Sequence, residues 1–286
     1  MKVLPVSFDS FSTRSMATLI ETDVKIIIDP SVAVGPKRYG LPPHEIELIE
    51  LNNSQQRIIG LSKYVDLVII THYHWDHCPS PNSKHFNVLY GKNILAKSFK
   101  ENVNRSQGVR GRTVYVELKN KAHFIFADNK EYNLNNTTIL FSEPVWHGMR
   151  GSKLGYVLMA LIQYKNDSIL FASDIQGVLD NKTKNIISEF NPTMIIMSGP
   201  ATYHSFWRDR LLKISNSNIK EIIEKTSVKN IIVDHHLTRD LYFREKIKDL
   251  IYFANQFGVT IQTAAEYLGI KNKLLEARRK ELYNNI

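Results

Sequence analysis

Short apolar runs recur along the chain, and most are bounded by polar or turn-forming residues. Runs of this kind, rich in Val, Ile, Leu and Phe, are typical of buried β-strands. The sequence predicts strands at residues 2–7, 16–22, 24–29, 67–71, 113–118, 123–127, 137–141, 155–163, 168–173, 193–198, 230–234 and 259–263. The early runs follow one another closely, as in hairpins, whereas the later runs alternate with helical patterns. This order predicts an α/β protein with mixed sheets and helices outside them.

Helical spacing of apolar residues is clearest in the second half of the chain. Asn216 or Ser217 is expected to cap one helix, and residues 239–257 form a second pattern of the same kind. Residues 264–283 predict one or two further helices, broken near Gly269. No repeat, low-complexity tract or long linker divides the sequence. We therefore expect a single domain over residues 1–286, whose C-terminal helices start at about residue 264.

Several of the predicted strands end abruptly in a polar residue. Asp29 closes IIID, His72 follows LVIIT, Asp174 follows ILFAS and His235 follows NIIVD. In α/β proteins, functional sites collect where strands end at one edge of the sheets, because the loops there turn side chains toward a common point. These residues are therefore expected to lie near one another.

The densest of these clusters is HYHWDH at residues 72–77. Alternation along an extended or tightly turned segment directs His72 and His74 the same way, while Asp76 and His77 face a second point nearby. Imidazole nitrogens and carboxylate oxygens are ligands for zinc, iron or manganese. The spacing indicates two adjacent divalent metal ions, with zinc favoured and iron or manganese as alternatives.

This string resembles the HxHxDH signature of the metallo-β-lactamase superfamily, and it follows an apolar strand as it does in that family. The remaining motifs occur in the same order. KIIIDP resembles the early motif in which Asp29 supports the site from behind the ligands. PVWHG supplies His147 at the position of the next histidine ligand, and FASDIQG supplies Asp174 at the position of the carboxylate that bridges two metals.

The last ligand of the resemblance is a histidine in IIVDHHLTRD, where two candidates are adjacent. The spacing to Arg239 matches the family pattern better with His235 than with His236, so His235 is favoured and His236 stays open. The resemblance extends over about residues 3–239. It implies a four-layer αββα sandwich with two mixed β-sheets and a binuclear site at one edge.

Four other segments resemble a mainly archaeal group of predicted metal-dependent hydrolases within the superfamily. They are DPSVAVGPKRYGLPPHEIEL, NRSQGVRGR, HGMRGSKLGYVL and LLEARRKEL. This narrower resemblance implies the fold and the metals and leaves the substrate open. The chemistry it implies is hydrolysis by a hydroxide that bridges the two metals.

The resemblance assigns further roles around such a hydroxide. Asp76 would ligate one metal and orient the hydroxide, and Asp174 would bridge. His236 and His204 are candidates for a general acid that protonates the leaving group. For each of the two, a structural role is an equal alternative: orienting a ligand for His236, and a place in a loop for His204.

Basic residues suggest the class of substrate. The chain carries a formal net charge of +9, which attracts anions. Residues 104–112 contain two glycines, which favours an anion-binding loop over a helix. Arginine forks suit phosphate oxygens, so a phosphoester or phosphodiester substrate is favoured, nucleic acid included. The candidate substrate-binding residues are Lys37, Arg38, Arg105, Arg110, Arg112 and Arg239. For each, a solvated surface charge is the alternative.

Other residues are interpreted as structural. Trp75 is expected to pack against the motif rather than stack on a base, and Cys78 to be a small buried residue. Arg278, Arg279 and Lys280 alternate with glutamates and predict an exposed helix face.

The single cysteine excludes an intramolecular disulfide. No signal peptide or membrane span is evident, so a cytoplasmic protein without a membrane partner is expected. The oligomeric state, including a homo-oligomer, stays open.

Three other functions compete with phosphoester hydrolysis. A hydrolase of a lactone, thioester or other carboxyl ester would use the same metals. A di-iron protein that reduces dioxygen usually carries glutamate at the place of His74, which disfavours it here. A non-catalytic nucleic-acid-binding protein typically has lost ligands, and none is missing from this sequence.

Overall fold

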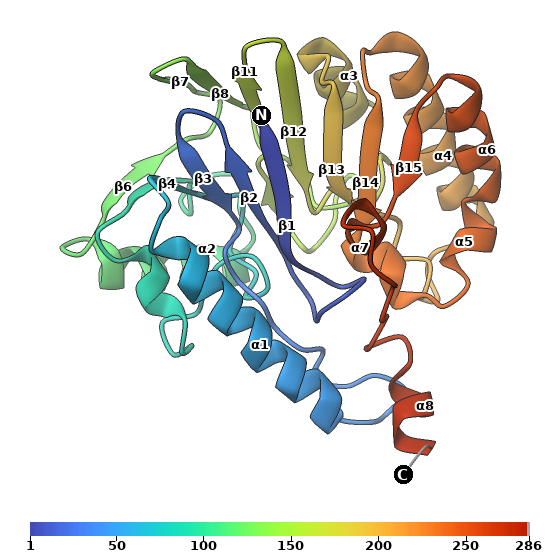
Figure 1. The fold of residues 1–286 in the computed structure, drawn as a ribbon, viewed down its shortest axis with the longest axis horizontal. Coiled ribbons are helices and arrows are strands. Elements are labelled where there is room, and N and C mark those ends of the chain that lie inside the picture. Colours follow the sequence, from blue (N-terminus) through green and yellow to red (C-terminus); the bar gives the residue numbers. More distant parts are fainter. Residues whose placement is uncertain (285–286) are drawn as a thin grey trace.

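The computed structural model describes residues 1–284, which form two large β-sheets with helices on their outer faces (Figure 1). The first sheet has the strand order β1-β2-β3-β4-β5-β6, and the second has the order β15-β14-β13-β12-β11-β8-β7. The strands of the first sheet are β1 (Lys2–Phe8), β2 (Met16–Glu21), β3 (Lys25–Ile28), β4 (Leu67–Ile70), β5 (Asn93–Ala96) and β6 (His123–Phe126). Those of the second are β7 (Glu131–Leu134), β8 (Thr137–Phe141), β11 (Ala160–Tyr164), β12 (Asp167–Ser173), β13 (Met194–Ser198), β14 (Asn230–Asp234) and β15 (Thr260–Gln262).

Both sheets are mixed, and they are built alike. Antiparallel pairs come first, β1 to β3 in one sheet and β7, β8, β11 and β12 in the other. Parallel strands follow, β3 to β6 and β12 to β15. Parallel strands need crossover connections, which here carry helices. A separate two-stranded ladder pairs β9 (Val145–Trp146) with β10 (Tyr156–Val157).

Alternate residues of each central strand enter different cores. In β4, Leu67 and Ile69 lie in the core between the two sheets, whereas Val68 and Ile70 face the outer helices. In β13 the inner residues include Ile196. Burial on both faces explains why these strands read as continuous apolar runs. The four layers are therefore helix, sheet, sheet and helix.

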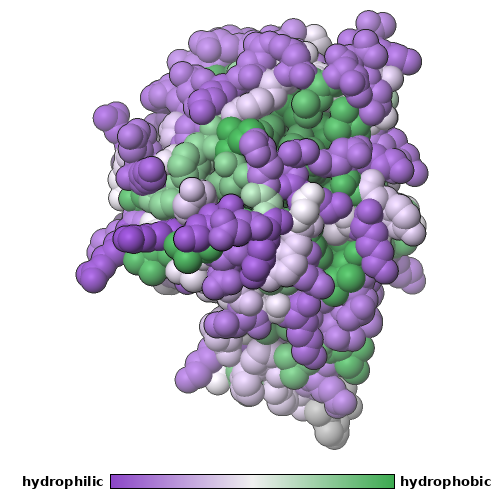
Figure 2. Space-filling model, turned by 90° about the vertical axis from the view of Figure 1, so that its left-hand side faces the viewer, coloured by the Kyte–Doolittle hydropathy of each residue, from purple (hydrophilic) through white to green (hydrophobic). Residues whose placement is uncertain are grey.

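The helices follow the strands as crossovers or cover the ends of the sheets. They are α1 (Glu45–Ser62), α2 (Arg105–Leu118), α3 (Asn181–Phe190), α4 (Asp209–Lys225), α5 (Phe243–Lys246), α6 (Lys248–Gln256), α7 (Ala264–Tyr267) and α8 (Arg279–Asn284), with short 3-10 turns η1 (Phe86–Leu89) and η2 (His235–Arg239). None of the helices in residues 1–284 is both long and apolar enough to cross a membrane. The face shown in Figure 2 is mostly hydrophilic, with apolar surface exposed between the polar side chains.

Two sequence predictions of secondary structure were wrong. Residues 113–118 are the second half of α2, because Val114 and Leu118 are the buried members of an i, i+4 helix face. Helix α4 begins at Asp209, ahead of the predicted caps at Asn216 and Ser217.

Helix α1 was not predicted, and its burial is the reverse of the usual pattern. Glu47, Glu50 and Ser54 are buried, whereas Ile46 and Ile49 are about half exposed, at 45% and 54%. The buried side of the first turns is held by ion pairs and hydroxyl contacts, whereas Ile58, nearer the C-terminal end, is fully buried in the apolar core. Glu50, for example, accepts hydrogen bonds from Arg57 and Lys273 at 2.9 and 3.0 Å.

The C-terminal residues cross to α1 and correct another prediction. Arg279 was expected on an exposed helix face, but its side chain is fully buried and pairs with Glu47. Its Nε and Nη2 donate to the two Glu47 carboxylate oxygens at 2.7 and 2.8 Å. Nη2 and Nη1 also donate to the carbonyls of Gly35 and Leu41. Charge alternation in the sequence does not reveal that this one arginine has a carboxylate partner far along the chain.

Candidate metal centre

The polar residues that follow the apolar strands lie together at one edge of the two sheets. Asp29 follows β3, residues 71–77 follow β4, Asp174 follows β12 and His235 follows β14. Asp29, Ser173, Gln176 and His235 all have positive φ angles, between 48° and 57°. Left-handed backbone costs non-glycine residues on the order of 1 kcal/mol and is retained mainly where function needs it. These turns aim side chains from both sheets at one region.

The first cluster of potential ligands joins His72, His74, His147 and Asp174, whose ligand atoms all lie within 4.8 Å of one another. The Nδ1 of His74 is 3.2 Å from the Nε2 of His72 and 3.2 Å from the Nε2 of His147. The Nε2 of His147 is 3.1 Å from Asp174 Oδ2.

The second cluster joins Asp76, His77 and His235, again within 4.8 Å. The Nε2 of His235 is 3.5 Å from Asp76 Oδ2 and 3.6 Å from Asp174 Oδ1. Asp174 therefore lies between the clusters, with Oδ2 near His147 and Oδ1 near His235.

Hydrogen bonds behind the clusters fix the histidine rings. His77 donates from Nδ1 to Asp29 at 2.8 Å, and His235 donates from Nδ1 to Asp9 at 2.6 Å. A histidine that donates from Nδ1 presents the Nε2 lone pair on its other side. Asp29 thus holds a candidate ligand from behind, as the resemblance implied. Asp9 was not recognised in the sequence, although it directly follows the first apolar strand.

Burial and charge set the protonation of the clusters. Burial lowers the pKa of His72 well below its usual value and that of His74 to about 3. Burial alone would raise the pKa of Asp174, but the surrounding histidines, His77 first, hold it well below its usual value. Neutral imidazoles and ionised carboxylates are the forms that bind metals. The electrostatics of these three residues favour those forms.

The unpaired atoms of the site fit a divalent cation. Asp174 Oδ1 is buried and, within the described part of the chain, has no hydrogen-bond donor. The Nδ1 of His74 lies 3.2 Å from the Nε2 atoms of both His72 and His147, so three ring nitrogens gather at one point beside Asp174. The donor set of nitrogen and carboxylate oxygen suits a transition metal. The clusters therefore support the use of a divalent metal.

The adjacent histidines of IIVDHH have different surroundings. His235 is fully buried and touches both Asp76 and Asp174. His236 lines the cavity, with Nε2 at 3.2 Å from Asp174 Oδ2 and Nδ1 at 3.2 Å from Arg239 Nη1. Arg239 Nη2 also lies 3.0 Å from His235 Nε2, so a metal at His235 would compete with this contact.

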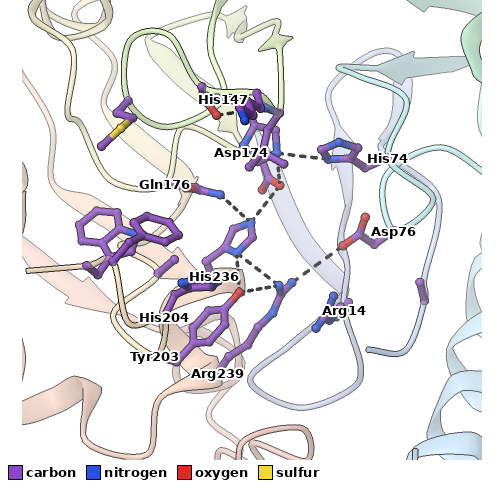
Figure 3. Close-up of a pocket in the computed structure, with 18 of the residues that line it drawn as sticks. Arg14, His74, Asp76, His147, Asp174, Gln176, Tyr203, His204, His236 and Arg239 are labelled. Atoms are coloured by element: carbon purple, nitrogen blue, oxygen red, sulfur yellow. Dashed lines mark hydrogen bonds and ion pairs between the residues drawn. The ribbon is translucent and has the colours of Figure 1, made fainter. Parts of the chain in front are cut away.

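A cavity of about 840 Å³ opens over the clusters (Figure 3). Its charged wall includes Arg14, Arg110, Lys153 and Arg239. Apolar side chains also line the cavity, among them Trp75, Met149, Leu154, Phe206 and Trp207. Arg14 and Asp76 lie on one side of the cavity and His204 on the other, with Asp174 and His236 between them (Figure 3).

The predicted substrate-binding residues separate into two groups. Arg110 and Arg239 line the cavity, and Arg38 stacks on Tyr203 behind it and donates to the Arg239 carbonyl at 2.9 Å. Lys37, Arg105 and Arg112 are exposed and do not line it.

The prediction that residues 104–112 form a loop was wrong, because residues 105–112 are the first half of α2. Gly111 is there for close packing: a Cβ atom at this position would lie 2.5 Å from Phe99 Cβ and 2.8 Å from Tyr73.

Two cavity residues were missed in the sequence because their positions depend on distant partners. Arg14 donates to both oxygens of Glu276 at 2.6 Å, across most of the chain. Tyr203 contacts Arg239 and His236 through its hydroxyl, each at 3.4 Å. Neither follows a motif, and no pattern in the sequence distinguishes them.

Comparison with known proteins identifies the family. No family model matches the chain. A UPF0282 protein of Sulfurisphaera tokodaii is 38% identical over 291 residues, covering 99% of this chain and 93% of that protein. A UPF0282 protein of Korarchaeum cryptofilum is 37% identical over 286 residues, covering 99% and 94%. The chain belongs to the UPF0282 family. The archaeal group expected from the sequence is thereby confirmed.

Solved structures show the fold of this UPF0282 chain. Tm1679, described as a metal-dependent hydrolase of the β-lactamase superfamily, matches with a TM-score of 0.50 and 13% identity over 91% of this chain and 94% of that one. CmlA, a diiron β-hydroxylase from Streptomyces venezuelae, matches with a TM-score of 0.51 and 12% identity over 88% of this chain and 52% of CmlA. The predicted metallo-β-lactamase fold is confirmed.

Proposed function

We propose that this chain is a hydrolase that uses two divalent metal ions, most simply zinc, with iron or manganese as alternatives. The observation that carries the proposal is the position of Asp174 between two clusters: Oδ2 lies 3.1 Å from His147 and 3.4 Å from His77, and Oδ1 lies 3.6 Å from His235. The proposed ligands of the first ion are His72, His74, His147 and Asp174, and those of the second are Asp76, His77, His235 and Asp174.

Two such cations, when bound, lower the pKa of a shared water and stabilise negative charge on the attacked group. The residues of the chain orient the ligand rings and the water. Asp29 and Asp9 hold the rings of His77 and His235 through Nδ1, so that both Nε2 atoms face the centre. Asp76 accepts from the water and orients it toward the cavity.

His236 is the proposed general acid. Its Nε2 lies at the cavity wall, 3.2 Å from Asp174 and 3.4 Å from the Gln176 side-chain nitrogen. Burial lowers the pKa of His236 to about 3, so the ring is neutral near pH 7. Because Arg239 donates to Nδ1, the single proton of the neutral ring is on Nε2, at the cavity wall. His204 is the weaker candidate, since its ring is exposed and stacks on Phe206, with a centroid distance of 4.3 Å.

The proposed substrate is a phosphoester or a phosphodiester, with nucleic acid in this class. Arg110 and Lys153 line the cavity and supply positive charge, while Arg14 and Arg239, also in its lining, are paired with Glu276 and Asp9. Guanidinium groups bind phosphate oxygens through paired hydrogen bonds. The charge of the cavity wall therefore favours an anionic substrate over a neutral one.

Carboxyl ester hydrolysis is the second candidate, because the cavity also has an apolar side. Met149, Leu154, Phe206 and Trp207 would contact the hydrocarbon part of a lactone or thioester.

A substrate panel with the zinc-loaded protein tests both candidates. Bis(p-nitrophenyl) phosphate, p-nitrophenyl phosphate, p-nitrophenyl acetate and a γ-lactone are each assayed before and after chelation. We expect metal-dependent cleavage of a phosphorylated compound, lost in His74→Ala and retained in His204→Ala if His236 is the acid. Cleavage of only the uncharged esters would replace the first candidate with the second. Cleavage that persists after metal removal would refute both.

A further inference from the structure

Helix α2 is tied to both segments that border the cavity beside it. Asn104 donates from its side chain to the Lys153 carbonyl at 2.8 Å, and Gln107 donates to the Leu154 carbonyl at 2.6 Å. The Gln107 side chain also accepts from the backbone N–H of Tyr73, inside the HYHWDH turn, at 3.3 Å. The segment NRSQGVRGR, which supplies no proposed metal ligand, is thus joined to residues 149–154 of HGMRGSKLG, and together they line one part of the cavity through Arg110 and the latter segment.

Arg110 extends from this helix over the metal motif. Its guanidinium carbon lies 5.0 Å from the centre of the Trp75 ring, and both residues line the cavity. Trp75 stands between His74 and Asp76 in the chain, so the arginine is placed beside the clusters without joining them. The Trp75 carbonyl accepts from Ser31 Oγ at 2.6 Å, which fixes the backbone beneath the ring.

The charge of Arg110 is not balanced by a carboxylate. Arg14 is paired with Glu276 and Arg239 with Asp9. For Arg110, no carboxylate oxygen in residues 1–284 lies within ion-pair distance, and its neighbour is the face of an indole. A cation–π contact orients a guanidinium but leaves its charge and its hydrogen-bond donors available. The protein therefore presents an oriented, uncompensated cation to the cavity.

We propose that Arg110, held against Trp75, binds an anionic group of the substrate that is not the group hydrolysed. This inference rests on the proposed function, since the metals would hold the reacting group. It deepens that function by specifying a substrate with at least two acidic groups, one at the metals and one at Arg110. Lys153, on the segment that α2 holds, adds positive charge to the same wall.

Phosphonates that cannot be hydrolysed distinguish binding at the metals from binding at Arg110. Binding of propylphosphonate and of a series of α,ω-alkanediphosphonates to the zinc-loaded full-length protein is measured by isothermal titration calorimetry. We expect one diphosphonate of suitable length to bind more tightly than propylphosphonate. Arg110→Gln should weaken that diphosphonate about tenfold or more, the worth of a charge-assisted hydrogen bond, and change propylphosphonate less than about twofold.

The same helix provides matched controls. Arg105→Gln and Arg112→Gln remove the same charge from exposed positions that do not line the cavity. Both variants should bind propylphosphonate and the diphosphonate with the affinities of the wild type. Trp75→Leu should weaken the diphosphonate alone, and Trp75→Phe should restore much of its affinity, because a positioning ring can be replaced by another ring.

The outcomes distinguish this inference from the proposed function. If Arg110→Gln and Arg112→Gln lose the same diphosphonate affinity, the effect comes from the overall positive charge of the helix. That result would overturn the inference. Equal affinity of wild type for all the phosphonates would also overturn it, even if phosphodiesters are hydrolysed. If the protein binds the diphosphonate selectively through Arg110 but hydrolyses none of the substrates of the panel, the anion site at Arg110 stands and the proposed function is refuted.

Discussion

The buried pair of Arg279 and Glu47 gives the sharpest test of how the C-terminal residues stabilise the fold. The substitution Arg279→Met keeps much of the side-chain volume and removes the guanidinium. It leaves the Glu47 carboxylate, 1% exposed, without its partner, and it removes the donors to the Gly35 and Leu41 carbonyls. The cost is the penalty of an unpaired buried charge rather than the loss of a contact.

Removing one partner of a buried ion pair costs about 3–5 kcal/mol, a large part of the roughly 5–15 kcal/mol by which typical domains are stable. With an unfolding entropy of about 0.6 kcal/mol/K for a chain of this length, the loss corresponds to a fall in Tm of about 5–8 °C. Urea unfolding followed by circular dichroism gives the free energy directly. Thermal scans of the same samples give the Tm.

The neighbouring Arg278, in the turn just before α8, supplies the control, since it is half exposed and pairs with Glu281 at 2.7 Å. Arg278→Met should change stability by less than about 0.5 kcal/mol. The double substitution Glu47→Leu with Arg279→Met should recover much of the loss, because an apolar pair needs no charge compensation. If Arg279→Met and Arg278→Met unfold at the same urea concentration, the pair does not stabilise the fold and the reasoning fails.

Three further measurements test other parts of the structure. Burial lowers the pKa of His85 to about 4, so the unfolded chain takes up its proton near pH 6.5 and the folded chain only near pH 4. Acidification through that window should therefore destabilise the wild type more than His85→Asn, by up to about 3 kcal/mol in urea titrations; parallel pH profiles would contradict this. Gly111→Ala should cost about 1–3 kcal/mol because its Cβ meets Phe99, whereas Gly60→Ala, with open space around it, should be neutral or stabilising. Asp174→Asn should lower the bound metal measured by mass spectrometry from about two ions per chain to one or none, while the exposed Asp167→Asn keeps the wild-type content.

Most strands could be predicted because their pattern is strong, although the short strands β5, β7 and β9 were missed. Central strands such as LVII and MIIMS are buried on both faces and stand out as continuous apolar runs between polar loops. Helix α1 could not be predicted in this way, since its buried positions include Glu47 and Glu50. The error at residues 113–118 has a related cause, because β-branched and aromatic residues on an exposed helix face imitate a strand.

The residues of the candidate site also divide into those that could be predicted from the sequence and those that could not. The clustered residues follow apolar strands directly, so their convergence at one sheet edge could be predicted from chain direction alone. Arg14 and Tyr203 join the site through partners far along the chain, and no local pattern marks them. Asp9 follows β1 as the clustered residues follow their strands, but its partners His235 and Arg239 lie far along the chain and it was not recognised. Arg110 was recognised as a candidate for the wrong reason, since its place depends on the helix that the sequence seemed to exclude.

The burial of charged residues on α1 affects how the attachment of this helix depends on temperature. A helix held by apolar packing loses part of its attachment on cooling, because the hydrophobic effect weakens. The first turns of α1 are held instead by Glu47, Glu50 and their cationic partners, whereas Ile58 anchors the C-terminal part of the helix in the apolar core. The cost of withdrawing such charges from water falls as temperature rises. We therefore expect the first turns of α1 to stay attached on heating while the apolar contacts of the other helices approach their limit.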